Sequence, residues 1–357
     1  MKNFFMTLAL VAMVATSCSN DDASLVNISG PQKSVKVSLE NVIATRVKDE
    51  MIPNASRVVL NECQVFFVGG DGMLYTGKDV NGSNTVTHYF TSAPSQSEDY
   101  HFLPPAVQKV VVVGNYGSEI SAASLNDIKV LVAKAEQQQD DENLLVYGEA
   151  ELVPITTDDK HGNSYKADVS VKPLVARIEV GGFACDFSDT PLYDEVKITM
   201  LALNNYYEEM TIGGTLSKLN STAIVSSNVY PFFNSTDAKP YTKDEISVTL
   251  TPDAPSVGFD DGKYLVYHTF AGSVPQLVVR ITGVKDGAES PLYLATSSFT
   301  YSGAKVNAFE AGNIYRMKFN GEDRFAFDEE DLNQPEKCVD VAVEAAEWVV
   351  VNVTPEF

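Results

Sequence analysis

Short segments in which hydrophobic and polar residues alternate run through most of this chain. Between residues 34 and 39, Val35, Val37 and Leu39 fall on one face of an extended backbone. A period of two residues is typical of a β-strand with one buried face. Further segments that predict strands lie at residues 57–60, 64–68, 109–113, 144–147, 167–171, 174–180, 195–203, 246–250, 264–270, 276–282, 292–299 and 314–319. Turn sequences at residues 69–72 and 79–82 predict hairpins between strands.

One segment, residues 121–139, departs from this pattern. Its apolar residues are spaced by three and four positions: Leu125, Ile128, Val132 and Ala135. That spacing predicts an α-helix that covers an edge or a face of a sheet, with Ser121 or Ser124 as its N-cap.

Many short strands and a single helix predict an all-β fold. The chain has 357 residues, 44% of them hydrophobic, which is enough for two sandwich-sized cores. Pro173 interrupts the strand pattern, so we place a domain boundary near residues 170–173. The prediction is two tandem antiparallel β-sandwich domains, at residues 34–171 and 172–335.

The last segment, residues 336–357, is another strongly apolar stretch. Its apolar positions include Val339, Val341, Val343, Trp348 and Val350. A strand of such high β-propensity is an aggregation hazard when its edges stay unpaired. It is therefore expected to pair with a sheet of its own subunit or of a neighbouring one, and the sequence leaves both alternatives open.

The first residues have the features of an export signal. Lys2 precedes an apolar run at residues 4–15 that is too short to span a bilayer, so residues 1–17 are predicted to be a signal peptide. Small residues precede Cys18 as in a lipobox, where the thiol is acylated. Lipid on Cys18, followed by a polar tether at residues 18–33, would hold a precursor on a membrane. The alternative is an ordinary signal peptide that ends near a cysteine.

The composition argues against a nucleic-acid partner and against a disulfide framework. The chain has 48 Asp and Glu against 26 Lys and Arg, a net charge of −22, which would repel a nucleic-acid backbone. Beyond Cys18 the cysteines are few and scattered, namely Cys63, Cys185 and Cys338. An exported protein of this size is therefore expected to be held together by packing and not by a disulfide framework.

Motifs of catalysis are missing from the sequence. The four histidines lie far apart without metal-ligand spacing, and the sequence has neither a G-x-S-x-G turn nor a P-loop. The acidic clusters at residues 260–261 and 328–331 lack the spacing of a calcium loop. A remote pair of carboxylates for glycoside hydrolysis leaves no mark in a sequence and stays open. We expect no enzyme activity, no metal and no cofactor.

Paired aromatic residues raise an alternative function. Tyr206-Tyr207 and Phe232-Phe233 could form a surface for stacking glycans or adhering to a host, but aromatic residues are also ordinary strand core. Packing is the favoured interpretation, and exposure of these rings as one contiguous patch would favour binding.

Several segments resemble a known family, and they lie at residues 110–117, 124–129, 171–178, 309–315 and 346–351. Their order, together with Cys18, resembles that of the Bacteroidales fimbrillins, the type V pilins, over essentially the whole chain. The resemblance implies two transthyretin-like β-sandwich domains, export as a lipoprotein, removal of an N-terminal strand by an arginine-specific protease, and polymerisation by strand exchange.

Carried onto this chain, the resemblance implies that residues 34–46 form the removable first strand. Its core residues are Val35, Val37 and Leu39. Cleavage is expected between Arg46 and Val47, with Arg57 as a downstream alternative. Cleavage there would separate the mature protein from its lipid anchor.

The same resemblance implies a donor strand at residues 336–357, carrying Val339, Val341, Val343, Trp348 and Val350. The expected partners are copies of the chain itself and other fimbrial subunits, joined by strand exchange, and the arginine-specific protease. The expected location is the outer membrane for the lipidated precursor and then an extracellular fimbrium that supports adhesion. A tip or anchor subunit, a glycan- or host-binding lipoprotein, and the identity of any surface receptor stay open.

Overall fold

The structure is a computed structural model that describes residues 31–352, with gaps at residues 41, 45–56, 79–83, 86–87, 91–96, 141–142, 156–162, 260–262, 297, 319, 334–339 and 348. Strands dominate this part of the chain, and its α-helices are the short α1 (Leu125–Lys129) and α2 (Val229–Asn234). The predicted all-β fold is confirmed. Within the described residues, none of the helices has the length and hydrophobicity needed to cross a membrane.

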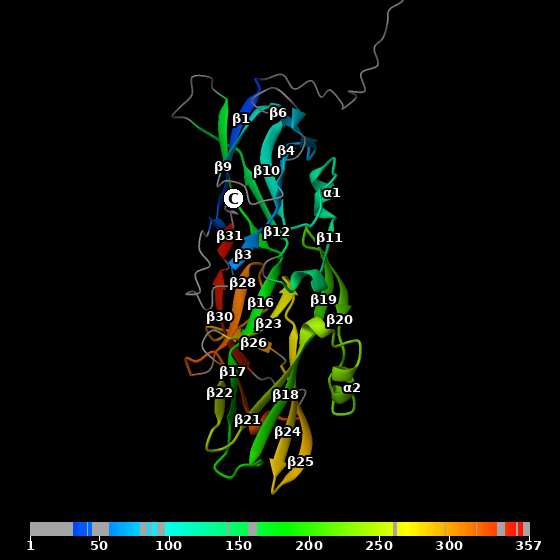
Figure 1. Cartoon of the computed structure of the whole chain (residues 1–357), viewed down its shortest axis with the longest axis vertical. Coiled ribbons are helices and arrows are strands. Elements are labelled where there is room, and N and C mark those ends of the chain that lie inside the picture. Colours follow the sequence, from blue (N-terminus) through cyan, green and yellow to red (C-terminus); the bar gives the residue numbers. More distant parts are fainter. Residues whose placement is uncertain are drawn as a thin grey trace, which may run out of the picture.

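The molecule is elongated, with the N-terminal strands at one end (Figure 1). These strands are β1 (Lys33–Glu40), β4 (Cys63–Gly69), β5 (Leu74–Tyr75), β6 (Gly77–Lys78), β7 (Asn84–Thr85), β8 (His88–Phe90), β9 (Ser97–Leu103), β10 (Val107–Gly114), β12 (Val146–Glu151), β13 (Val153–Pro154), β14 (Ser164–Ser170) and β15 (Lys172–Pro173). They form two six-stranded sheets. One has the order β13-β14-β1-β9-β6-β7, and the other has the order β15-β12-β10-β4-β5, with β8 paired to β4.

Side chains of these two sheets share one hydrophobic core. Val35 and Val37 of β1 belong to the same buried cluster as the valines of β10. Phe67 of β4 and Tyr100 of β9 pack edge to face, with ring centroids 4.8 Å apart. Ile128 of α1 is also fully buried in this cluster, so the helix extends the core.

Most of the other strands lie towards the opposite end of the molecule (Figure 1). They are β16 (Val175–Val180), β17 (Gly182–Asp186), β18 (Glu195–Asn204), β21 (Lys243–Leu250), β22 (Ser256–Gly258), β23 (Leu265–Phe270), β24 (Gln276–Lys285), β25 (Ala288–Ala295), β26 (Ser298–Tyr301), β27 (Ala304–Lys305), β28 (Asn313–Lys318), β29 (Phe325–Asp328) and β30 (Asp340–Glu347). Their sheets have the orders β23-β16-β28-β30-β26-β27, β21-β18-β24-β25 and β22-β17-β29. A second core lies among these sheets, and α2 packs Phe232 and Phe233 in a third cluster with residues of β18, β24 and β25.

Two further three-stranded sheets pair distant parts of the chain. The first has the order β11-β19-β20 and consists of β11 (Val132–Lys134), β19 (Tyr206–Thr211) and β20 (Leu216–Asn220). The second has the order β2-β31-β3 and consists of β2 (Val42–Ala44), β3 (Arg57–Leu60) and β31 (Val349–Asn352). The second sheet joins the N-terminal and C-terminal segments of the described chain.

The change from one core to the next falls close to the expected domain boundary. Val175 is in the first cluster and Ala176 is in the second. The first cluster also includes later residues, namely Met210, Ile212, Phe270 and Ile314. The boundary near residues 170–173 remains a proposal, and this change of core supports it.

The helix predicted at residues 121–139 is wrong in extent. α1 has five residues; the Ser124 side chain accepts a hydrogen bond from the Asp127 amide, so Ser124 is its N-cap. Residues 132–134 instead form β11, which pairs with β19, and the 3₁₀ helix η1 (Ala135–Gln138) follows. Hydrogen bonds to a distant strand thus outweigh the local helical spacing, because intrinsic helix propensity is weak compared with tertiary interactions.

The hairpin turn predicted at residues 69–72 is confirmed, because β4 pairs with β5 across it. The Gly72 amide donates to the Gly69 carbonyl oxygen at 2.9 Å, and Gly72 has φ of 79°, where glycine avoids the strain of a Cβ. The second expected hairpin, at residues 79–82, lies outside the described residues.

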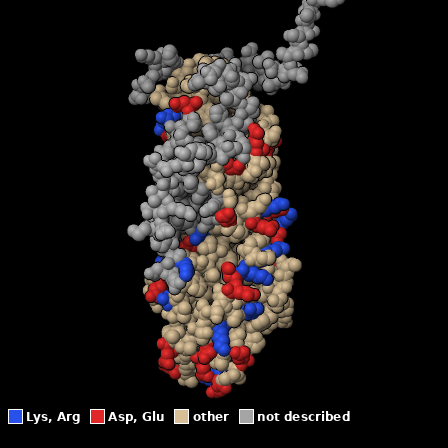
Figure 2. Space-filling view, viewed as in Figure 1, with Lys and Arg blue, Asp and Glu red and all other residues tan. Residues whose placement is uncertain are grey.

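Charged residues of both signs are spread over the face seen in Figure 2, and acidic side chains gather at the end formed by β18, β24 and β25. Some are paired there: Lys285 Nζ lies 2.9 Å from Asp194 and Lys197 Nζ lies 3.0 Å from Glu289. All four side chains are well exposed, so the pairs contribute little to stability.

Candidate assembly site

The first described strand, β1, lies inside its sheet. It pairs in parallel with β14 from Ser34 to Glu40 and antiparallel with β9 from Lys33 to Ser38. Both of its edges are therefore satisfied by other strands. Without β1, two rows of backbone donors and acceptors would lack partners, which is costly unless another strand supplies them.

Side chains of β1 alternate between core and surface. Val35 and Val37 are 1% and 4% exposed, Leu39 is half-buried against the same core, and Lys36 is exposed. Burial of each valine stabilises the fold by about 1.5–3 kcal/mol before ordering costs. The strand expected from the alternating pattern is present, and its removal stays a prediction.

Polar contacts fix the start of β1. Lys33 Nζ donates to the Val107 carbonyl oxygen at 2.5 Å and lies 4.8 Å from the centre of the Tyr165 ring. Partial burial lowers the pKa of the Lys33 amine. Ser34 Oγ lies 3.1 Å from His101 Nδ1. These contacts join the start of β1 to β10, β14 and β9.

The C-terminal strands occupy two different places. β30 is an inner strand that pairs antiparallel with β28 and in parallel with β26, and Val343 is 5% exposed within the second core. β31 leaves this sheet and lies between β2 and β3, in parallel with both. Among the expected donor residues, Val341 is thus in β30 opposite Phe299, whereas Val350 is in β31 between Val42 and Val58.

Other predicted site residues lie outside the described part of the chain. They are Cys18, Arg46, Val47, Val339 and Trp348. The segment that contains Arg46 connects β2 to β3, whereas the alternative Arg57 is the first residue of β3 and is registered with Val349 of β31. Lipidation, cleavage and strand donation all stay predictions.

A buried ion cluster joins β28 to β16. Glu179 is fully buried and accepts hydrogen bonds from Arg177 Nε at 2.7 Å and from Arg316 Nε at 2.8 Å. Arg316 also lies over the Tyr264 ring, 4.9 Å from its centre. Because β28 pairs with β30 on its other side, the cluster lies in the sheet that holds β30, one strand away from it.

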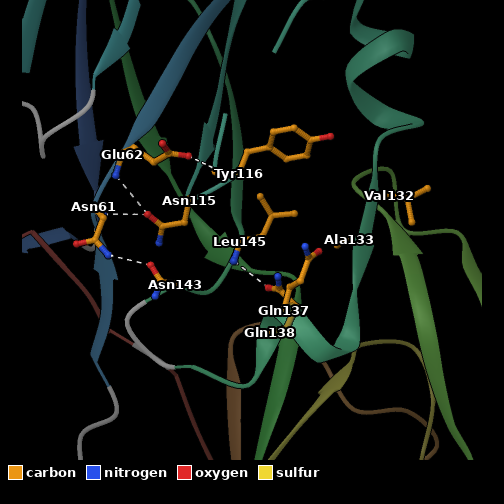
Figure 3. Close-up of a pocket in the computed structure, with 11 residues that line it drawn as sticks. Asn61, Glu62, Asn115, Tyr116, Val132, Ala133, Gln137, Gln138, Asn143 and Leu145 are labelled. Carbon is orange, nitrogen blue, oxygen red and sulfur yellow. Dashed lines mark hydrogen bonds between the residues drawn. The ribbon is translucent and has the colours of Figure 1, made fainter. Parts of the chain in front are cut away.

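A pocket of about 390 Å³, lined by both polar and apolar residues, lies where β3 leads into β4 (Figure 3). Asn115 has φ of 58°; its Oδ1 accepts hydrogen bonds from the Asn61 and Glu62 amides at 2.9 and 3.3 Å, and its Nδ2 donates to the Leu144 carbonyl oxygen at 3.0 Å. Gln138 Oε1 accepts from the Leu145 amide at 2.8 Å. These amides connect loops at the ends of β3, β10 and β12, and we assign them a structural role.

The sequence interpretation missed this group of amides. One signal was available, because Asn115 stands between Gly114 and Tyr116 directly after a predicted strand, and asparagine tolerates the left-handed backbone better than most residues. The loops that Asn115 joins are far apart in sequence, so the spacing alone could not have located its partners.

The paired aromatic residues are packed. Tyr206, Phe232 and Phe233 are at most 2% exposed, and the two phenylalanine rings meet edge to face at 5.4 Å. The preference for packing over a glycan-stacking surface is confirmed for these three side chains. Tyr207 is half-buried.

The cysteines in the described part of the chain are buried thiols with a raised pKa. Cys63 and Cys185 are buried free thiols, and burial, the larger effect, together with nearby carboxylates raises the pKa of each thiol to about 12. A thiol with so high a pKa is a poor nucleophile at neutral pH. Over the described residues, no group of three or more His, Cys, Asp or Glu is arranged to hold a metal ion.

Solved structures of other proteins share this fold. A candidate cell adhesion protein from Bacteroides eggerthii superposes with a TM-score of 0.57 and 15% identity, covering 92% of this chain and 99% of its own. A fimbrilin from Porphyromonas gingivalis has a TM-score of 0.51 and 14% identity, with 90% and 99% covered. A candidate cell adhesion protein from Parabacteroides distasonis has a TM-score of 0.51 and 13% identity, with 90% and 98% covered.

Comparison at the level of sequence gives no match. Neither the protein-family models nor the curated proteins contain one for this chain. The similarity to fimbrilin and cell adhesion structures therefore establishes a shared fold, which extends over nearly the whole of both chains.

Proposed function

We propose that this protein is a structural subunit of a cell-surface fimbria that polymerises by strand exchange. The observation that carries the proposal is the place of β1, an N-terminal strand that is hydrogen-bonded on both edges and contributes Val35 and Val37 to a core. A chain that loses such a strand requires a replacement, and a strand donated by another subunit is the direct way to supply one.

The shared fold supports a fimbrial or adhesive role at the cell surface. The compared proteins are described as a fimbrilin and as candidate cell adhesion proteins, and they match along nearly their full length. Export as a lipoprotein through Cys18 belongs to the same proposal, because the lipid would retain the precursor at the outer membrane until cleavage.

Cleavage is assigned to the Arg46–Val47 bond. Arg46 stands in the segment that connects β2 and β3, whereas Arg57 is the first residue of β3 and is in a ladder with β31. A protease requires several extended residues on each side of the bond, and a paired strand withholds them. The geometry of β3 thus favours Arg46 over Arg57.

Within residues 336–357, we assign the donor segment to the residues that follow Glu347. Withdrawing β30 would break its ladders to β28 and β26 and remove Val343 from the core of its own domain. β31 belongs to none of the three six-stranded sheets, and its run Val349-Val350-Val351 is apolar. A tail that starts at Trp348 can therefore leave while the second domain stays folded.

An exchange of this kind is directional. One subunit provides the tail and the next provides the groove of β1, so the two contacting surfaces differ. Such a heterologous contact does not close on itself and extends into a filament.

A test uses the unlipidated precursor, Cys18→Ser, and an arginine-specific protease. We expect a new N-terminus at Val47, followed by SDS-resistant ladders on a gel. The matched variants are Arg46→Lys, which keeps the charge but resists the protease and should stay monomeric, and Arg57→Lys, which should still polymerise.

A second pair of variants examines the donor segment. A chain that ends at Glu347 should be cleaved and remain monomeric, whereas a chain that ends at Asn352 keeps β31 and tests the contribution of the final five residues. Polymers from cleaved chains that end at Glu347 would overturn the assignment of the donor segment.

A further inference from the structure

β31 lies between two strands that come from opposite sides of the proposed cleavage site. Val350 is registered with Val42 of β2 on one edge and with Val58 of β3 on the other. β2 ends at Ala44 and β3 begins at Arg57, so Arg46 falls in the connection between them. In Figure 1, β31 and β3 lie together midway along the molecule.

We propose that β31 is a latch that couples departure of the N-terminal strand to release of the C-terminal tail. The proposal rests on the cleavage and strand exchange proposed above. It goes beyond them because it assigns to the donor segment a second task within its own subunit, before any partner is met.

Cleavage at Arg46 has different consequences for the two neighbours of β31. β3 remains in the mature chain, whereas β2 belongs to the fragment that carries β1. When this fragment leaves, β31 loses the three registered pairs from Val42–Val350 to Ala44–Asn352. One edge of β31 then has free backbone donors and acceptors, which is the state that favours pairing with another chain.

The coupling also acts in the opposite direction. The cleaved fragment is held by the ladders of β1 to β14 and β9 and by the ladder of β2 to β31. If the fragment stabilises β31 in its place, then β31 must stabilise the fragment by the same free energy, because linkage is reciprocal. Before cleavage the latch keeps the tail on its own subunit, and premature assembly is disfavoured.

The test measures how fast the cleaved fragment leaves. Unlipidated precursor is cut with the arginine-specific protease at nanomolar concentration, where exchange between subunits is slow, and the fragment ending at Arg46 is followed by mass spectrometry after gel filtration. Ending the chain at Glu347 should speed its release about tenfold, the effect of losing one or two net main-chain hydrogen bonds. Ending the chain at Asn352 keeps β31 and should leave the rate unchanged.

A double-mutant cycle, which combines substitutions in β2 with removal of β31, distinguishes the latch from a general loss of stability. Adjacent residues of a parallel strand bond alternately to a given neighbour, so either Val42→Pro or Ile43→Pro should remove a bond to β31 and speed release. That acceleration should vanish in the chain that ends at Glu347, whereas Lys36→Pro in β1 should speed release equally in both chains.

Hydrogen exchange tests the same coupling in the unaltered sequence. The amides of residues 349–352 should be protected in the precursor and should lose protection when the fragment has left. Equal release with and without β31, or unchanged protection after release, overturns the latch while strand exchange stands. Complete cleavage with no departure of the fragment from any chain overturns both proposals.

Discussion

β1 and β30 have equivalent positions at opposite ends of the described chain. Each is an inner strand of a six-stranded sheet with one parallel and one antiparallel neighbour. Each also buries a valine, since Val37 and Val343 are 4% and 5% exposed. The difference lies in their surroundings: β30 adjoins a strand held by the Glu179 ion cluster, whereas β1 leads through β2 to Arg46. Sheet position alone therefore does not identify a strand suited to exchange.

The largest effect is expected when the cluster beside β30 is broken. Glu179→Ala leaves Arg177 and Arg316 without their buried carboxylate, and removal of one partner from a buried ion cluster costs about 3–5 kcal/mol. Urea unfolding measures the loss. The control is Glu289→Ala, which removes an exposed pair with Lys197 and should change stability by less than about 0.5 kcal/mol. Equal losses for the two variants would show that the cluster does not strengthen this sheet.

A matched pair of core substitutions then separates the two strands. Val37→Ala and Val343→Ala should each lower the free energy of unfolding of the uncleaved precursor by about 2 kcal/mol, through lost burial and a small cavity. After cleavage and release of the fragment, only Val343→Ala should still have an effect, because β1 is gone. A persistent effect of Val37→Ala on the isolated mature monomer would mean that β1 is retained.

The smallest effect concerns Glu149 of β12, which lies in the sheet β15-β12-β10-β4-β5. Burial by itself would raise the pKa of Glu149 on β12, but hydrogen bonds from Lys109, Lys129 and Tyr147 lower it to about 2. A carboxylate with a lowered pKa stabilises the fold above its unfolded value, near 4.5, and loses this contribution as the pH falls towards 2. Because Glu149 is 23% exposed, we expect only about 1 kcal/mol.

Glu149→Gln measures this contribution. The variant should be less stable than the unaltered protein at pH 6, and the two should converge between pH 4.5 and pH 2, as followed by urea unfolding. A constant difference across that range would assign the effect of the substitution to packing and not to charge.

Local sequence predicted the type of most elements correctly. The alternation at Val35, Val37 and Leu39 became β1, the valines at residues 110–113 became a buried central strand, and Ser124 caps a helix. The helix predicted to include Val132 is an exception. Val132 instead pairs with Thr211 of β19, a partner that no local sequence pattern indicates. Parallel neighbours such as β14 for β1 were likewise absent from the sequence interpretation, which expected antiparallel sheets throughout.

The amino-acid sequence by itself determined where strands form, since the alternation of apolar side chains fixes which face each segment must bury. It also placed Cys18 and Arg46 in the segments that precede and follow the first strand. Only the tertiary structure decided that the C-terminal segment divides into β30, built into the sheet of β28 and β26, and β31, held between β2 and β3. The physical reason is that an apolar strand can form its main-chain hydrogen bonds with many different partner strands. The choice among these partners depends on segments that lie hundreds of residues away in the sequence.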